Sequence, residues 1–264
     1  MSNTISFLHS GDMGDIVAGM AAIKELCEQQ NKKAVLYLDT TGGMTCNDQK
    51  LNDLIRKQSN GLGLKFNDTG YDFLVPLIEI QPYIERVEKW TPEIKKVDIN
   101  LNKFRHGFYH RKVILHTNQN LLYMQQMCCR LKERYNGPWL KCEKKDFSKK
   151  IVVARSCRYQ SASEFYHARE IKLGNEAYFI GTDTEYSAFS DEIRTKIERF
   201  PVTNALDAAV LINSSNLVIC NGTLFYWIAA GLGKTIINEV GTDTPTTQFK
   251  DANNIKYIKG FHFI

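Results

Sequence analysis

Two kinds of apolar spacing alternate along the start of the chain. Residues 4–9 and 34–38 are short apolar runs typical of β-strands, whereas residues 16–29 carry apolar side chains every three or four positions, as helices do. The order strand, helix, strand predicts a β-α-β unit at the beginning of the protein.

The rest of the first half continues this alternation. We expect short strands at residues 86–90, 97–101 and 112–116, and then a helix over residues 120–135 whose apolar side chains again recur at helical spacing. These elements complete a first sheet with its covering helices.

The second half begins after a lysine-rich connector at residues 142–150. Strands are predicted at residues 151–154, 177–180, 217–220 and 235–238. Asn204 is expected to cap one helix, and another helix is expected over residues 222–230, ended by Gly231 and Gly233. The second half therefore repeats the architecture of the first.

Strands that alternate with helices throughout predict an α/β protein with parallel sheets. We expect two Rossmann-like domains facing one another across a cleft, the first at residues 1–145 and the second at residues 146–264. Ligands bind such sheets at the carboxyl ends of the strands, so the loops that follow the strands are the candidate sites.

The composition is that of a globular protein, with 43% hydrophobic and 24% charged residues. Seven cysteines are scattered along the chain without any C-x-x-C pair, which disfavours a disulfide framework and a zinc site. The N-terminus lacks the features of a signal peptide, and no apolar run reaches the length of a membrane span. We expect a cytoplasmic protein with reduced thiols, no bound metal and no cofactor.

The net charge is +5, and basic residues gather at positions 103–112 and 141–150. These stretches are compatible with a polyanionic partner such as nucleic acid. A mildly basic, solvated surface explains them as well and is the favoured interpretation.

The loop after the first strand combines glycines with two acids. Its residues are Ser10, Gly11, Asp12, Met13, Gly14 and Asp15. Glycine permits a tight turn and a close approach of the backbone, and the helix that follows offers free N–H groups to a ligand. Two acids exceed what helix capping needs, which favours a catalytic or binding role for at least one of them, although both also suit the positive end of the helix dipole.

This loop is not a G-x-G-x-x-G fingerprint, and the chain contains no G-x-x-x-x-G-K-[ST] P-loop. Both absences disfavour a dinucleotide-dependent dehydrogenase and an NTPase. His9 ends the first strand, where a lone histidine is more often structural than a ligand contact.

Three loops of the second half follow predicted strands. Arg155, Ser156 and Arg158 come after residues 151–154, and guanidinium groups at that edge match the oxygens of a diphosphate. Thr182 and Asp183 come after residues 177–180, where they suit a ribose, base or sugar hydroxyl and equally an ordinary turn.

The third of these loops is Asn221, Gly222 and Thr223. It lies directly before a predicted helix and offers amide donors and a hydroxyl at the helix N-terminus, where anions bind. A simple N-cap by Asn221 or Thr223 is compatible with this role.

Two segments resemble the heptosyltransferase-like glycosyltransferases, family 9 of the GT-B class. They are HSGDMGDIVAGMAAIKEL near the start and LDAAVLINSSNLVICNGTLFYWIAAGLGKTIINEV near the end. VARSCRY and FIGTDTEY further resemble short GT-B-like proteins of bacteria and bacteriophages. The family usually carries an acid in the second-half turn, where this chain has Asn221.

The resemblance implies an inverting, metal-independent transfer from a nucleotide-sugar donor to an acceptor hydroxyl. Asp15 matches the base that deprotonates the acceptor, and the first domain would hold the acceptor. The second domain would hold the nucleotide diphosphate, with Arg155, Ser156, Asn221 and Thr223 around the phosphates.

Two alternatives stay open. A phage-type, DNA-directed glycosyltransferase acting on hydroxymethylated bases would use the basic stretch at residues 103–112 against phosphates. A noncatalytic nucleotide-sugar-binding protein would keep the cleft without turnover, as the altered second-half turn suggests.

Overall fold

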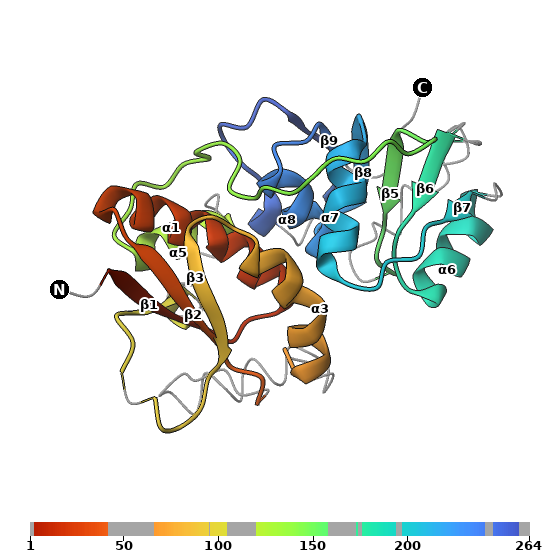
Figure 1. Cartoon of the computed structure of the whole chain (residues 1–264). Helices are drawn as coiled ribbons and strands as arrows, with labels where there is room; N and C mark the ends of the chain where they lie inside the picture. The colour runs from red at the N-terminus through yellow and green to blue at the C-terminus, as the bar shows by residue number, and fades with distance from the viewer. Residues whose placement is uncertain are drawn as a thin grey trace. The chain divides into compact units, whose positions relative to one another are not determined.

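The computed structural model describes residues 3–41, 66–94, 96–104, 120–157, 173, 176–193, 197–240 and 245–258. The chain forms two compact units, Met1–Arg134 and Tyr135–Ile264. Each unit contains its own sheet, and every pair of neighbouring strands is parallel (Figure 1). The predicted α/β class with two parallel sheets is confirmed.

The first unit has a four-stranded sheet in the order β3-β2-β1-β4. Its strands are β1 (Thr4–His9), β2 (Lys33–Leu38), β3 (Ile84–Lys89) and β4 (Ile99–Asn100). The strands predicted at residues 4–9, 34–38, 86–90 and 97–101 all fall on these elements. The strand predicted at residues 112–116 lies outside the described residues.

Three α-helices of the described chain accompany this sheet. They are α1 (Met13–Gln30), α3 (Asp68–Glu79) and α5 (Leu121–Cys128), and the 3-10 turn η1 (Leu101–Lys103) follows β4. Helix α1 buries Ile16, Met20 and Ile23 at spacings of three and four and packs against α5. Helix α3 was not anticipated from the sequence.

The helix predicted over residues 120–135 is wrong in its length. Asn120 is the N-cap of α5, which begins at Leu121 and ends at Cys128. Arg130 then has a φ of 58°, a left-handed conformation that no α-helix continues. The last part of the predicted helix is therefore an irregular segment held by side-chain contacts.

The second unit has a six-stranded sheet in the order β10-β9-β8-β5-β6-β7. Its strands are β5 (Ile151–Ala154), β6 (Ala177–Phe179), β7 (Glu198–Arg199), β8 (Leu217–Asn221), β9 (Ile236–Glu239) and β10 (Ile255–Ile258). The four strands predicted from apolar runs are confirmed, whereas the short β7 and the half-exposed β10 were not predicted.

The helices of the second unit are α6 (Asp183–Ile193), α7 (Ala205–Ser214) and α8 (Leu224–Gly231), with the 3-10 turn η5 (Pro245–Thr247) after β9. Asn204 caps α7 as predicted, because its side chain accepts a hydrogen bond from the Asp207 N–H at 2.9 Å. Within the described residues, no helix combines the length and the apolar character that a membrane crossing needs.

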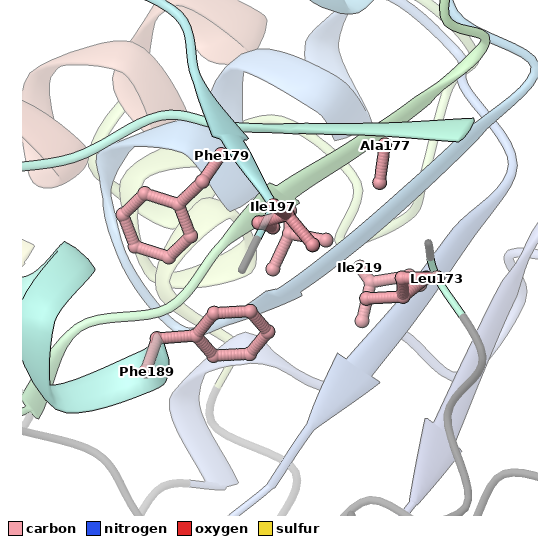
Figure 2. Close-up of a cluster of buried hydrophobic side chains, with 7 residues drawn as sticks. Leu173, Ala177, Phe179, Phe189, Ile197 and Ile219 are labelled. Carbon is pink, nitrogen blue, oxygen red and sulfur yellow. The ribbon is translucent and has the colours of Figure 1, made fainter. Parts of the chain in front are cut away.

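One hydrophobic cluster packs α6 against the strands of the second sheet. Its buried members are Val153, Leu173, Ala177, Phe179, Phe189, Ile197 and Ile219, most of which Figure 2 labels. The rings of Phe179 and Phe189 stack with centroids 5.2 Å apart.

The segment that enters the second unit packs against the end of α8. The N–H groups of Trp139 and Leu140 both donate to the Gly231 carbonyl, at 2.9 and 2.8 Å. A side chain at Gly231 would meet Leu140, since an added Cβ would lie 2.8 Å from Leu140 Cδ1. Glycine at position 231 thus lets the segment with Trp139 and Leu140 approach the end of α8 closely, in addition to its place at the end of the helix.

Candidate functional site

The loop at residues 10–15 joins the carboxyl end of β1 to α1, as the sequence predicted. Asp12 is the N-cap of α1, and its N–H donates to Asp15 Oδ2 at 3.2 Å. Asp15 lies in the first turn of the helix and is only 9% exposed. The two acids are thus neighbours in one capping arrangement, and this geometry serves the helix dipole.

Glycine is needed where the loop meets Asp15. A Cβ at Gly11 would lie 2.7 Å from both Cβ and Oδ2 of Asp15. Met13 and Gly14 are the first two residues of α1 and are half-buried. The loop therefore presses its backbone directly against the predicted catalytic carboxylate.

Asn102, in η1, holds the loop from the side of β4. Its Oδ1 accepts the Ser10 N–H at 2.7 Å. The Ser10 hydroxyl is buried and has no hydrogen-bond partner among the described residues. Sequence reasoning missed Asn102, because an asparagine 92 positions away from Ser10 gives no sign of this contact.

A third acid, Asp39, lies at the same edge of the first sheet. It follows β2, is 1% exposed, and its N–H donates to the His9 carbonyl at 3.0 Å. Its Oδ1 accepts hydrogen bonds from the N–H and the hydroxyl of Thr41, at 2.9 and 2.7 Å. Sequence reasoning missed Asp39, although an acid directly after an apolar strand was the available signal.

Arg155 follows β5 at the carboxyl edge of the second sheet, as predicted. Its side chain is fully buried and forms two hydrogen bonds with Glu239, from Nε to Oε2 at 2.6 Å and from Nη2 to Oε1 at 2.9 Å. Glu239 ends β9, and β8 lies between β5 and β9, so this ion pair spans three strands. A phosphate contact by Arg155 stays a prediction, and the observed geometry favours a role in holding the edge together.

Ser156 and Asn221 form a second link across this edge. The Ser156 N–H donates to Asn221 Oδ1 at 3.0 Å, and Asn221 Nδ2 donates to the Ser156 carbonyl at 2.8 Å. Asn221 is fully buried. The structure thus brings together Arg155, Ser156 and Asn221, which the sequence placed in two separate loops.

Gly222 and Thr223 lead from β8 into α8. A Cβ at Gly222 would lie 2.8 Å from Thr247 Cγ2, so the turn fits closely under η5. Thr223 is the N-cap of α8, and its hydroxyl is buried with no hydrogen-bond partner in the described part of the chain. The N-terminus of α8 therefore lies at the carboxyl edge, beside Asn221.

Thr182 and Asp183 lie at the start of α6 and are exposed. Thr182 donates from both its N–H and its hydroxyl to Glu185 Oε2, at 2.8 and 3.0 Å, and Asp183 forms an ion pair with Arg199. Such contacts are typical of a capped helix start. They agree with the interpretation of these residues as an ordinary turn, and sugar or ribose contacts by them stay a prediction. Arg158, the remaining predicted phosphate ligand, lies outside the described residues.

Cys220, in β8, is fully buried. Burial, and then the Glu239 carboxylate, raises the pKa of the Cys220 thiol, so this cysteine in β8 stays protonated. Within the described ranges, no group of three or more His, Cys, Asp or Glu side chains has a metal-binding arrangement.

The first unit also has a surface hollow of about 400 Å³. It is lined by Thr4, Ile5 and Ser6 of β1, by the end of α1, and by Asp98 and Ile99 at the start of β4. No residue of the loop at residues 10–15 lines this hollow. The hollow is therefore separate from the loop at residues 10–15.

No protein-family model and no curated protein matches the sequence. Several solved structures match it over nearly the whole chain. E. coli heptosyltransferase WaaC with ADP has a TM-score of 0.59 and 11% identity, covering 96% of this chain and 92% of that one. E. coli ADP-heptose lps heptosyltransferase II has a TM-score of 0.54 and 11% identity, covering 97% and 90%.

A glycosyl transferase family 9 protein from Veillonella parvula DSM 2008 gives a similar result. Its TM-score is 0.55 at 11% identity, with 98% of this chain and 88% of that one covered. Likeness at this identity is a likeness of fold. The resemblance read from the two sequence segments is confirmed at that level, and the chain has the α/β fold of these GT-B glycosyltransferase structures.

Proposed function

We propose that this protein is a glycosyltransferase that moves a sugar from a nucleotide-sugar donor to an acceptor hydroxyl. The observation that carries the proposal is the fold likeness, which extends over both units and includes heptosyltransferase WaaC with ADP. The polar residues at the carboxyl edge of each sheet support it further. Residues 1–145 would hold the acceptor and residues 146–264 the donor.

Asp15 is the proposed general base. Its carboxylate would take the proton of the acceptor hydroxyl while that oxygen attacks the anomeric carbon and the nucleoside diphosphate leaves. The hydrogen bond from the Asp12 N–H holds Oδ2 of Asp15 in the first turn of α1. A fixed carboxylate is what proton transfer requires, because misplacement by about 1 Å can cost about 100-fold in rate. Asp12, on the same loop, is the second candidate.

The donor diphosphate is proposed to bind at the N-terminus of α8. The N–H groups there carry partial positive charge, and the buried Thr223 hydroxyl lies beside them. Such donors stabilise a leaving diphosphate without a metal ion. In this proposal the Arg155–Glu239 pair and the Ser156–Asn221 pair fix the edge, with Gly222 permitting its close packing, and Thr182 and Asp183 are candidates for ribose or sugar contacts.

One alternative is favoured by a specific observation. Both acids of the first loop serve α1 as capping residues, which is also what a noncatalytic nucleotide-sugar-binding protein would retain. The DNA-directed alternative has no such support, because most of the basic stretch at residues 103–112 lies outside the described residues. The phage origin and the cytoplasmic location stay predictions.

A ligand screen tests the proposal first. Nucleoside diphosphates and nucleotide sugars should raise the melting temperature, since a ligand at about 100 times its Kd adds about 2.7 kcal/mol to the free energy of unfolding. Hits should then be incubated with candidate acceptors and assayed for transfer and for donor hydrolysis. Binding without either reaction would favour the noncatalytic alternative.

Asp15→Asn tests the base. We expect kcat to fall by about 100-fold to 10,000-fold with unchanged donor affinity, because the amide cannot accept the proton. The fold should persist, since the asparagine Oδ1 can still accept the Asp12 N–H. Asp12→Asn tests the second candidate base in the same assay, and an Asp15→Asn variant with full activity would remove Asp15 from the mechanism.

A further inference from the structure

The ring of His9 has a defined protonation state. Its Nδ1 lies 3.0 Å from the Gly11 N–H, which donates to it. A backbone N–H can only donate, so Nδ1 must be the unprotonated nitrogen. The imidazole of His9 is therefore neutral, with its proton on Nε2.

Gln125 of α5 meets this proton and continues the chain of hydrogen bonds. His9 Nε2 lies 3.0 Å from Gln125 Oε1, and Gln125 Nε2 donates to the Asp15 carbonyl at 2.7 Å. The reversed amide would place two acceptors against each other at Asp15, so the amide orientation is fixed as well. His9 and Gln125 are both fully buried.

Gly19 of α1 makes room for the Gln125 amide. A Cβ at Gly19 would lie 2.2 Å from Gln125 Oε1 and 3.3 Å from His9 Cδ2. Glycine weakens a helix interior, so its presence here needs a reason, and the close approach of Gln125 provides one.

We propose that His9 and Gln125 are positioning residues that set the geometry of the loop carrying Asp15. His9 fixes the loop at Gly11, Gln125 fixes it at the Asp15 carbonyl, and the two side chains hold each other. Strand β1, helix α5 and the first turn of α1 are thus coupled through buried, neutral hydrogen bonds. The proposed catalytic consequence rests on the proposed function, whereas the geometry does not.

The first test reads the tautomer directly in the full-length protein. Nitrogen NMR of the ¹⁵N-histidine-labelled chain should show one of the six histidines locked in a single neutral tautomer, with a protonated Nε2 and an unprotonated Nδ1, whereas a solvent-exposed histidine exchanges between its forms and gives averaged signals. Loss of that signal in His9→Gln assigns it. A His9 ring that is doubly protonated, or protonated on Nδ1 alone, would overturn the proposal.

The second test compares two adjacent glutamines of α5. Gln125→Met removes the hydrogen bonds to His9 and to the Asp15 carbonyl, whereas Gln126→Met removes hydrogen bonds to Glu25 and Arg134, which lie away from the loop. Gln126 is as buried as Gln125, at 1% exposure. The two variants therefore share the loss of a buried amide and differ in which part of the unit they release.

We expect Gln125→Met to shift the His9 nitrogen signals and to lower kcat by about 10-fold to 100-fold at constant donor KM. Gln126→Met should leave the His9 signals unchanged and kcat within about twofold. Gly19→Ala should reproduce the effect of Gln125→Met, because its methyl group displaces the same amide. Equal effects of the two glutamine variants on kcat and on the His9 signals would mean a merely structural role and would reject the proposal.

The outcomes separate this proposal from the proposed function. If the wild-type protein transfers no sugar but His9 shows the expected tautomer and responds only to Gln125→Met, the positioning geometry stands and the glycosyltransferase proposal fails. If transfer occurs and the His9 signals lack the expected tautomer, the glycosyltransferase proposal stands and the positioning proposal fails. If Gln125→Met does not fold, the wild-type tautomer and Gly19→Ala still decide.

Discussion

Different kinds of contact stabilise the carboxyl edge of the first sheet and the carboxyl edge of the second sheet. In the first unit, three uncharged side chains hold the loop that carries Asp15: the imidazole of His9, the amide of Gln125 and the amide of Asn102. In the second unit, a fully buried ion pair between Arg155 and Glu239 crosses the edge. Hydrogen bonds between uncharged side chains bury no net charge. In a buried ion pair, the loss of either partner leaves the other charge in the interior and strongly lowers the free energy of unfolding.

Strand order explains the difference. Arg155 follows β5 and Glu239 ends β9, the strands on either side of β8, and two strand spacings amount to about 10 Å. The long side chain of arginine can extend across that distance. In the first unit, by contrast, the partners of the loop come from β1 itself, from η1 and from a helix packed against α1, so short side chains suffice.

Breaking the ion pair should give the largest effect. Arg155→Met removes the guanidinium from beside the buried Glu239 carboxylate, which should lower the free energy of unfolding of the second unit by about 3–5 kcal/mol. Urea unfolding followed by tryptophan fluorescence measures this, because Trp139 and Trp227 both lie in that unit.

The double variant Arg155→Met, Glu239→Leu is the control for the ion pair. It removes both charges and keeps apolar volume, so it should recover most of the lost stability. A single variant that costs less than about 1 kcal/mol, or a double variant worse than either single one, would show that this edge does not depend on the pair.

The sequence predicted eight of the ten described strands, the loops after them and several cap residues, and it predicted the place of Arg155 but not its partner. An arginine at the end of a buried strand indicates a charged group at the sheet edge. Its partner, Glu239, lies 84 positions further along, and only the strand order brings the two together. Because that order is a property of the tertiary fold, apolar spacing alone gave no sign that the guanidinium would be buried.

Gln125 illustrates a second limit of sequence reasoning. It lies in a helix whose apolar positions were recognised, but a buried glutamine looks like any polar residue of an amphipathic helix. Its role follows only from its distances to His9 and to the Asp15 carbonyl. The first loop itself was predictable, since glycines and acids between a strand and a helix form a local pattern.

The asparagines that link neighbouring segments should show an intermediate effect. Asn221→Ala removes two hydrogen bonds to the Ser156 backbone, and Asn102→Ala removes one to the Ser10 N–H. We expect losses of about 1–3 kcal/mol in the free energy of unfolding, with the larger loss for Asn221. Urea titrations of both variants test the order, and a larger loss for Asn102→Ala would contradict it.

Helix caps offer the finest comparison of the two units, because each unit has an asparagine at the start of a helix. Asn120 accepts the Leu122 N–H at 2.8 Å and is fully buried, whereas Asn204 accepts the Asp207 N–H at 2.9 Å and is half-buried. Replacing an N-cap asparagine by alanine costs about 1 kcal/mol when water can reach the released N–H.

We therefore expect about 1 kcal/mol for Asn204→Ala and more for Asn120→Ala, since burial keeps water from the Leu122 N–H. Asparagine-to-serine variants at both positions are the matched controls, because serine retains a capping oxygen. If both alanine variants lost equal stability by thermal unfolding, burial would not distinguish the caps, and the contrast between the two units would be limited to the ion pair.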